Sequence, residues 1–155
     1  MRRALAIFCW VAAATTATAQ DAAIPDVIAQ WEVDRHTTFD ATFLDLDDFI
    51  WIARPVVVFA DNPNDPRFRQ QIDLLMELPG ELAARDVIIL TDTDPSANSA
   101  LRRRLRPRGF MAVLIGKDGQ IELRKPAPWS ARDITRSIDK MPLRRQEVED
   151  RRIQP

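Results

Sequence analysis

The sequence predicts a single α/β domain built as a three-layer sandwich, with one sheet between two layers of helices. Two apolar runs rich in β-branched residues, 55–60 and 86–91, have the composition of strands buried on both faces of a sheet. A third run, 110–115, is joined to a fourth, 120–124, by an Asp-Gly turn, which is a strong signal for a β-hairpin. Helical segments lie between the first three strands and after the hairpin, so the predicted order is β-α-β-α-β-β-α.

The first strand is preceded by a short helical turn within residues 44–51 and ends in a turn-forming stretch, residues 61–66. Asp65 suits the N-cap of the helix that follows, with Pro66 at its first position. Apolar side chains at three- and four-residue spacing give this helix one buried face, and a Pro-Gly pair ends or kinks it. The apolar residues are Phe68, Ile72, Leu75 and Met76.

Two further helices complete the predicted domain. After the second strand, an Asp-Pro-Ser sequence opens a helix over residues 96–106, which a proline and a glycine stop. Ser130 suits the N-cap of the last helix, and Asp133 can return a hydrogen bond in the manner of a capping box. Pro142 ends this helix in the prediction.

The N-terminal residues predict the compartment of the protein, and composition divides the rest of the chain into three segments. Residues 1–19 have the composition of a secretory signal peptide, with a positive start, an apolar run and small residues up to Ala19. We expect cleavage after Ala19 and a periplasmic or secreted protein, because no later run is apolar enough for a transmembrane anchor. The remaining segments are a polar lead-in over residues 20–45, the folded domain over 46–142, and a charged tail over 143–155 that we expect to be mobile or loosely docked.

Composition excludes several classes of function. Cleavage leaves 136 residues with 20 basic and 23 acidic side chains, and a net charge of −3 gives no general attraction to nucleic acid. The only cysteine, Cys9, lies in the signal segment, so the mature chain has no thiol. Because a thiolate is the attacking species in disulfide and peroxide chemistry, the sequence excludes a thiol oxidoreductase. It has no glycine-rich phosphate loop and no Cys/His metal spacing, and it predicts no cofactor.

Three segments carry a family resemblance: VVVFADNPNDPRFRQQ (56–71), GFMAVLIGKDGQIELR (109–124) and MPLRRQE (141–147). In this order, behind a signal peptide, they resemble a peroxiredoxin-like domain of unknown function. That domain occurs in bacterial secreted proteins and in vertebrate extracellular proteins of the sushi-repeat class. The resemblance implies a thioredoxin-like fold, which the predicted order of strands and helices also indicates, and it implies no established activity.

The redox centre of thioredoxins does not carry over to this chain. Thioredoxins place a Cys-x-x-Cys where the first buried strand turns into its helix, and the nearest counterparts here are Asn64 and Arg67. Phe110 stands where that fold has a cis-proline before its third strand. We therefore expect a non-catalytic domain that binds a protein or an envelope component.

The alternative is a metal-dependent hydrolase, because four carboxylates follow the first two strands. Open α/β sheets place ligands at this end of their strands, and oxygen ligands suit Mg²⁺ or Ca²⁺. The same side chains are also suited to turns and helix caps. A third interpretation is a purely structural envelope protein. The four candidate ligands are Asp61, Asp65, Asp92 and Asp94.

A run of arginines within residues 101–108 has two interpretations. It predicts either a solvated helix end, whose cations offset the helix dipole, or a contact surface for an anionic partner such as phospholipid headgroups, acidic glycans or an acidic protein face. The candidate contact residues are Arg102, Arg103, Arg106 and Arg108. We expect surface or packing roles for the single histidine, His36, and for Trp31, Trp51 and Trp129, which anchor the lead-in and the last helix to the core.

Overall fold

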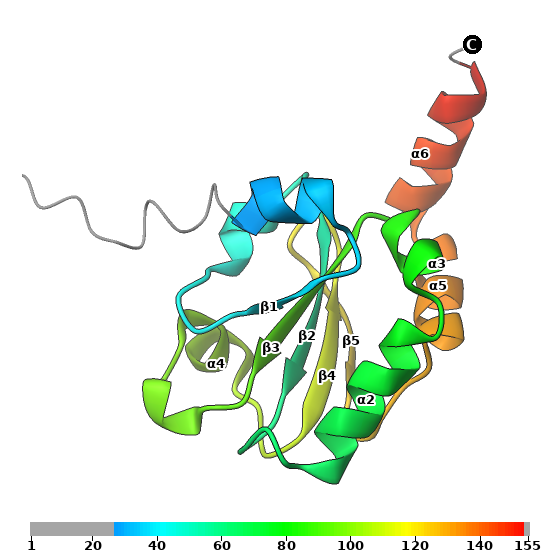
Figure 1. Ribbon diagram of the computed structural model, residues 1–155. Helices are drawn as coiled ribbons and strands as arrows, with labels where there is room; N and C mark the ends of the chain where they lie inside the picture. Colours follow the sequence, from blue (N-terminus) through cyan, green and yellow to red (C-terminus); the bar gives the residue numbers. More distant parts are fainter. Residues whose placement is uncertain (1–26, 154–155) are drawn as a thin grey trace, which may run out of the picture.

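The computed structural model describes residues 27–153, so the predicted signal peptide and the start of the lead-in lie outside the described residues. A five-stranded sheet with the order β1-β3-β2-β4-β5 forms its centre (Figure 1). β3 pairs in parallel with β1 and β2, whereas β4 is antiparallel to β2 and β5 to β4. This arrangement confirms the predicted thioredoxin-like α/β fold. The strands are β1 Thr38–Asp40, β2 Arg54–Phe59, β3 Val87–Asp92, β4 Met111–Ile115 and β5 Ile121–Lys125.

Helices cover both faces of the sheet (Figure 1). The helix at residues 27–33, η1 and α4 pack with one core cluster, and α2, α3 and α5 pack with the other. None of the helices within residues 27–153 has the length and apolar character that crossing a membrane requires. The labelled helices are η1 Leu46–Phe49, α2 Pro66–Met76, α3 Pro79–Ala83, η2 Pro95–Ala97, α4 Ala100–Leu105, α5 Ala131–Asp139 and α6 Pro142–Ile153.

The central strand β2 explains why its sequence is continuously apolar. Successive side chains of a strand point to opposite faces, and here both faces are covered. Val57 and Phe59 belong to the cluster under η1 and α4, whereas Val56 and Val58 belong to the cluster under α2 and α5. All six residues of β2 are buried, which the composition predicted for the apolar residues but not for Arg54.

The helix caps were predicted well where a local motif sets them. Asp65 accepts a hydrogen bond from the backbone N–H of Arg67 at 2.8 Å, and Pro66 is the first residue of α2. Ser130 caps α5 by accepting from the backbone N–H of Asp133 at 3.2 Å. The capping-box detail is different, because the Asp133 carboxylate accepts from the Ser130 hydroxyl, at 2.7 Å, rather than from its backbone.

The predicted helix over residues 96–106 is wrong as a single element. Asn98 adopts a left-handed conformation with φ of 45°, which separates η2 from α4. Ser99 then acts as a new N-cap and accepts from the backbone N–H of Arg102 at 3.1 Å. Asparagine tolerates the left-handed region better than most residues, so the break occurs where the sequence permits it.

The lead-in holds more structure than its weak periodicity indicated. Within its described part it forms the helix at residues 27–33 and the edge strand β1. Trp31 is 2% exposed and donates its indole N–H to the carbonyl of Val87 at 3.1 Å, which confirms its predicted anchoring role. The same prediction is wrong for Trp51, which is 67% exposed, whereas Trp129 packs against the core cluster of α2 and α5.

The predicted charged tail forms a helix, α6, in its described part. Pro142 does not end a helix but begins α6, because proline suits the first helical position, where no N–H bond is needed. Arg144 is buried and donates to the carbonyl of Ala84, and Glu147 pairs with Arg54 of β2. Beyond these contacts α6 projects from the domain (Figure 1). The charged character of residues 143–153 therefore reflects specific ion pairs as well as solvation.

Val58→Asp is expected to unfold the domain. Val58 is fully buried in the central strand, and an unpaired charge there costs several kcal/mol against a total stability of about 5–15 kcal/mol. Ile121→Asp, on the edge strand β5 where the side chain is 43% exposed, is the control and should melt within a few degrees of the wild type. Thermal unfolding followed by circular dichroism measures both, and a near-native melting temperature for Val58→Asp would contradict the central position of β2.

Candidate functional site

The turn between β2 and α2 occupies the place of a thiol centre but is built from polar side chains. Asn62 accepts a hydrogen bond from the backbone N–H of Asn64 at 2.9 Å. Arg67 pairs with Asp65 at 3.1 Å and lies over the ring of Phe110, 5.5 Å from its centroid. The hydrogen bond from the Arg67 side chain is the main reason that the pKa of Asp65 lies below its usual value. Asp65 is thus a charged cap.

The carboxyl end of β3 carries a buried ion pair. Asp92, 2% exposed, accepts from the hydroxyl of Ser99 at 2.6 Å and from Arg102 Nε at 2.7 Å. Arg102 also donates to the carbonyls of Ala60 at 2.7 Å and Asp92 at 3.0 Å. Its guanidinium lies 5.4 Å from the centroid of the Phe59 ring. The Asp92–Arg102 pair therefore ties α4 to the ends of β2 and β3.

The four candidate metal ligands serve separate purposes. Asp92 is paired with Arg102, and Asp65 caps α2. Asp94 caps η2, and its hydrogen bond from the Ser96 hydroxyl is the main cause of its lowered pKa. Asp61 is exposed near Gly109. Within residues 27–153, no three His, Cys, Asp or Glu side chains are placed to hold a metal ion, so the geometry gives the hydrolase alternative no support.

The arginine run divides into buried and exposed members. Arg102 was expected on the contact surface, but its side chain is only 9% exposed and satisfies Asp92, so that expectation is wrong. Arg103 donates to the carbonyl of Asn98, while Arg106 and Arg108 are exposed and their side chains form no hydrogen bond in the described part of the chain. Sequence reasoning missed Arg124, which reaches across from β5 to the Leu105 carbonyl.

These exposed side chains surround the end of α4. We call Arg103, Arg106, Arg108 and Arg124 the arginine surface. Within residues 27–153, none of the four forms an ion pair. Because Phe59 at the end of β2 pairs with Met111 at the start of β4, the arginine surface and the β2–α2 turn lie at the same end of the sheet.

A second group of charges, at the opposite end of the sheet, was not predicted. Arg54, the first residue of β2, is completely buried and pairs with Glu147 of α6 at 2.9 Å. It also donates to the carbonyl of Arg85 at 3.0 Å. In the sequence, an arginine just before an apolar strand looks like an exposed loop residue. The buried role of Arg54 becomes evident only from its pairing with Glu147, 93 positions away.

Lys117 and Arg144 extend this group. Lys117, in the hairpin turn, lies 2.8 Å from Asp86 and 3.3 Å from Glu147. Arg144 lies 3.3 Å from Glu147 and donates to the carbonyl of Ala84 at 3.2 Å. We call Arg54, Asp86, Lys117, Arg144 and Glu147 the α6 cluster. Lys117 and the pair Arg144 and Glu147 come from two of the three segments that carry the family resemblance.

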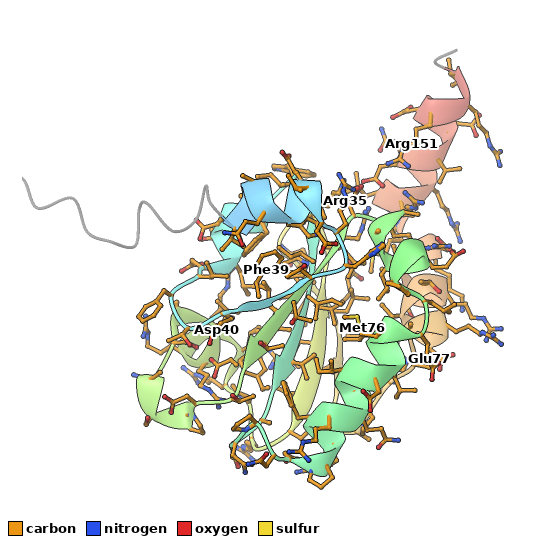
Figure 2. All side chains as sticks on the ribbon, in the orientation of Figure 1. Arg35, Phe39, Asp40, Met76, Glu77 and Arg151 are labelled. Atoms are coloured by element: carbon orange, nitrogen blue, oxygen red, sulfur yellow. The ribbon has the colours of Figure 1, made fainter. Side chains whose placement is uncertain are left out.

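Two further arginines, one half-buried and one exposed, complete the surroundings of Asp86. Arg35 lies 2.6 Å from one of its carboxylate oxygens, and Arg151 of α6 lies 3.7 Å from the other. Figure 2 shows Arg35 and Arg151 at the end of the domain where α6 leaves it. Arg35 also lies over the ring of Trp31, 4.5 Å from its centroid. Asp86 therefore connects the lead-in helix, the hairpin turn and α6.

The electrostatics of the α6 cluster favour charged carboxylates. Burial raises the pKa of Glu147, but the hydrogen bond and charge of Arg54, with Lys117, outweigh it, so the pKa lies below its usual value. Burial likewise raises the pKa of Asp86, and its bonds with Lys117 and Arg35 lower it by more. Glu147 and Asp86 in their charged forms thus stabilise the fold at pH values above their ordinary pKa values. This stabilisation is lost as the pH falls through the lowered pKa values that the two groups have in the folded protein.

Removing Arg102 should be far more damaging than removing its neighbour. Arg102→Gln leaves the buried Asp92 carboxylate without its cation, which should lower the free energy of unfolding by about 3–5 kcal/mol. Arg103→Gln, one position along and exposed, should change it by no more than about 0.5 kcal/mol. Urea unfolding measures both values, and equal effects would show that Arg102 is solvated.

Glu147→Gln should flatten the pH dependence of stability. The wild type should lose stability as the pH falls below the ordinary pKa values of Glu147 and Asp86, because both carboxylates then take up protons through lowered pKa values. Glu147→Gln should be less stable at pH 7 and should show a smaller further loss in that range. Glu149→Gln, on an exposed side of the same helix, is the control and should keep the wild-type slope. Parallel slopes for all three proteins would contradict the Arg54–Glu147 pairing.

Comparison with solved structures finds similar chains. Plasmodium yoelii Prx1a, described as modified at the N-terminus and forming an artifactual octamer, has a TM-score of 0.49 and 17% sequence identity, covering 66% of this chain and 80% of its own. Plasmodium yoelii thioredoxin peroxidase I has a TM-score of 0.46 and 17% identity, with 66% and 79% covered. At these values the fold assignment rests on the strand order and pairing described above. No curated protein matches the sequence.

The sequence also matches a family over most of the folded region. Residues 45–147, more than half of the chain, match the family described as Domain of unknown function (DUF4174). The matched range begins at the capping aspartate of η1 and ends at Glu147, so it takes in β2 through β5 and the half of α6 that contacts the sheet. The chain therefore belongs to the DUF4174 family.

Proposed function

We propose that the protein is an exported, non-catalytic thioredoxin-like domain that binds a protein or another component of the cell envelope. One observation carries the proposal. At the carboxyl ends of the parallel strands, where open α/β sheets place their ligands, the chain presents a polar turn beside an exposed arginine surface, and no cysteine lies in residues 27–153. Export to a periplasmic or secreted location is supported by the composition of residues 1–19.

The side chains that could act as nucleophiles or bases have structural roles. The hydroxyls of Ser99 and Ser130 lie beside carboxylates, but both serines are helix N-caps. The only histidine, His36, lies in the exposed loop before β1. A catalytic nucleophile needs a base within hydrogen-bond reach and a group that orients the base. These contacts support binding rather than covalent catalysis.

The arginine surface supports an anionic partner. A guanidinium group presents a planar set of donors that matches carboxylate and phosphate oxygens, and it stays charged at every physiological pH. Arg106 and Arg108 are exposed and form no ion pair in the described chain. The side chains of Arg103 and Arg124 donate hydrogen bonds only to backbone carbonyls. Since the mature chain carries a net charge of −3, attraction to an anionic partner has to come from this local concentration of positive charge.

Binding to native envelope membranes or to anionic vesicles tests this proposal. Arg103→Gln, Arg106→Gln and Arg108→Gln together should lower retention at least about tenfold, and retention of the wild type should fall as salt rises, because exposed charges are screened over roughly 8–10 Å. The matched control replaces three exposed cations on the other side of the domain, Arg132, Lys140 and Arg145, with glutamine.

The controls decide between a site and general charge. Both triple variants change the net charge equally and leave Arg102 in place, so both should fold. Equal losses in the two variants would show attraction to charge without a specific surface. The proposal would be contradicted if the wild type were not retained, or if its retention changed neither with salt nor with any of the substitutions. The arginines would then be only the solvated end of a helix.

A further inference from the structure

A cavity lies between the hairpin turn and the start of α6, at the end of the sheet opposite the arginine surface. Its volume is about 190 Å³, room for several waters or one small organic molecule. The buried Arg54 and the turn residue Lys117 line it from the sheet, and Pro142 and Leu143 line it from α6. The cavity therefore adjoins the α6 cluster.

The buried charges of the α6 cluster do not balance. Three cations, Arg54, Lys117 and Arg144, have side chains that are 0%, 14% and 9% exposed. Only two carboxylates face them at comparable depth, Asp86 and Glu147, at 13% and 18%. A third, Asp139, lies 3.9 Å from Nε of Arg144 but is 46% exposed. A buried cation without a counter-charge is costly, so this cluster has room for one more negative charge.

Two buried donors are also without acceptors. Nε of Arg54 and Nε of Arg144 are shielded from solvent, and neither has a hydrogen-bond partner among the described residues. Buried polar atoms in native proteins nearly always have a partner. Nε of Arg144 lies 3.9 Å from a carboxylate oxygen of Asp139, so Nε of Arg54 is the donor that calls for a ligand or ordered water. Arg54 lines the cavity, whereas Arg144 does not.

The first turn of α6 adds a third positive feature. Met141 stands at the N-cap and has no oxygen to accept a hydrogen bond, and no acidic residue lies in the first turn. Within residues 27–153, the backbone N–H groups of Leu143 and Arg144 have no acceptor. The N-terminus of a helix attracts negative charge through such N–H groups and the helix dipole.

The mouth of the cavity has the opposite charge. Asp118 and Glu122 are exposed lining residues, and both carboxylates lie close to Gly116, where an added Cβ would be 2.5 Å and 3.2 Å from them. A doubly charged anion such as phosphate would be repelled there. A ligand with an ammonium group next to its carboxylate would instead match both the interior and the mouth.

We propose that this cavity binds a small zwitterionic amino acid. Its carboxylate faces Arg54, Lys117 and the first turn of α6, and its ammonium group faces Asp118 and Glu122. The site is distinct from the arginine surface, so it does not depend on the function proposed above.

Titration of the full chain with glycine, acetate and phosphate, at constant ionic strength, tests the site by NMR. Glycine should produce saturable shifts in the backbone amides of Leu143 and Arg144 and in the Nε–H signal of Arg54. Acetate should bind more weakly because it lacks the ammonium group, and phosphate should bind most weakly. No saturable shift with glycine, equal binding of glycine and acetate, or preferred binding of phosphate would overturn the proposal.

A pair of exposed substitutions separates the two halves of the site. Asp118→Asn with Glu122→Gln should weaken glycine binding by roughly three- to tenfold and strengthen acetate binding by a similar factor. Glu149→Gln with Asp150→Asn, the same charge change further along α6, should leave both affinities unchanged. If both double variants shift the two affinities alike, the mouth carboxylates do not contact the ligand and the amino-acid assignment is wrong.

Discussion

The buried charge of Arg54 at the start of the central strand is the constraint on which the architecture depends. β2 pairs with both β3 and β4, so its position sets the register of the sheet. Its first residue places a guanidinium where solvent does not reach, and leaving such a charge unpaired would cost more than most domains can tolerate. Glu147 supplies the counter-charge, so the chain has to return to this end of the sheet after α5.

The opposite end of the sheet follows the same principle with different residues. Asp92 at the end of β3 is as deeply buried as Arg54, and Arg102 of α4 compensates it while bonding to the last carbonyls of β2 and β3. Each ion pair holds a helix against the ends of the parallel strands. The arginines around α4 that remain exposed lie next to the β2–α2 turn, whereas the cavity lies where α6 meets the hairpin turn. Each of the two proposed binding regions thus lies where an ion pair holds a helix against one end of the sheet.

The sequence correctly predicted those features of the fold that depend on interactions between neighbouring residues. The buried runs of β2 and β3, the hairpin, and the caps Asp65 and Ser130 each depend on neighbouring residues, and each lies where the sequence indicated. β1 was missed because three residues carry too short a pattern. Arg102, Arg54 and α6 were misjudged because arginine is usually exposed, and its burial depends on partners that only the fold brings near.

A double-mutant cycle on Arg54 and Glu147 tests most directly the claim that this pair docks α6 to the sheet. Glu147→Leu should lower the free energy of unfolding by about 3–5 kcal/mol, because it leaves the buried Arg54 guanidinium without a carboxylate. Arg54→Met should lower it by less, because Lys117 and Arg144 still lie 3.3 Å from Glu147. The double variant, with two apolar side chains of similar size in contact, should lose far less than the sum of the two. Losses that add to within about 0.5 kcal/mol would show that the two residues do not interact and would contradict the account.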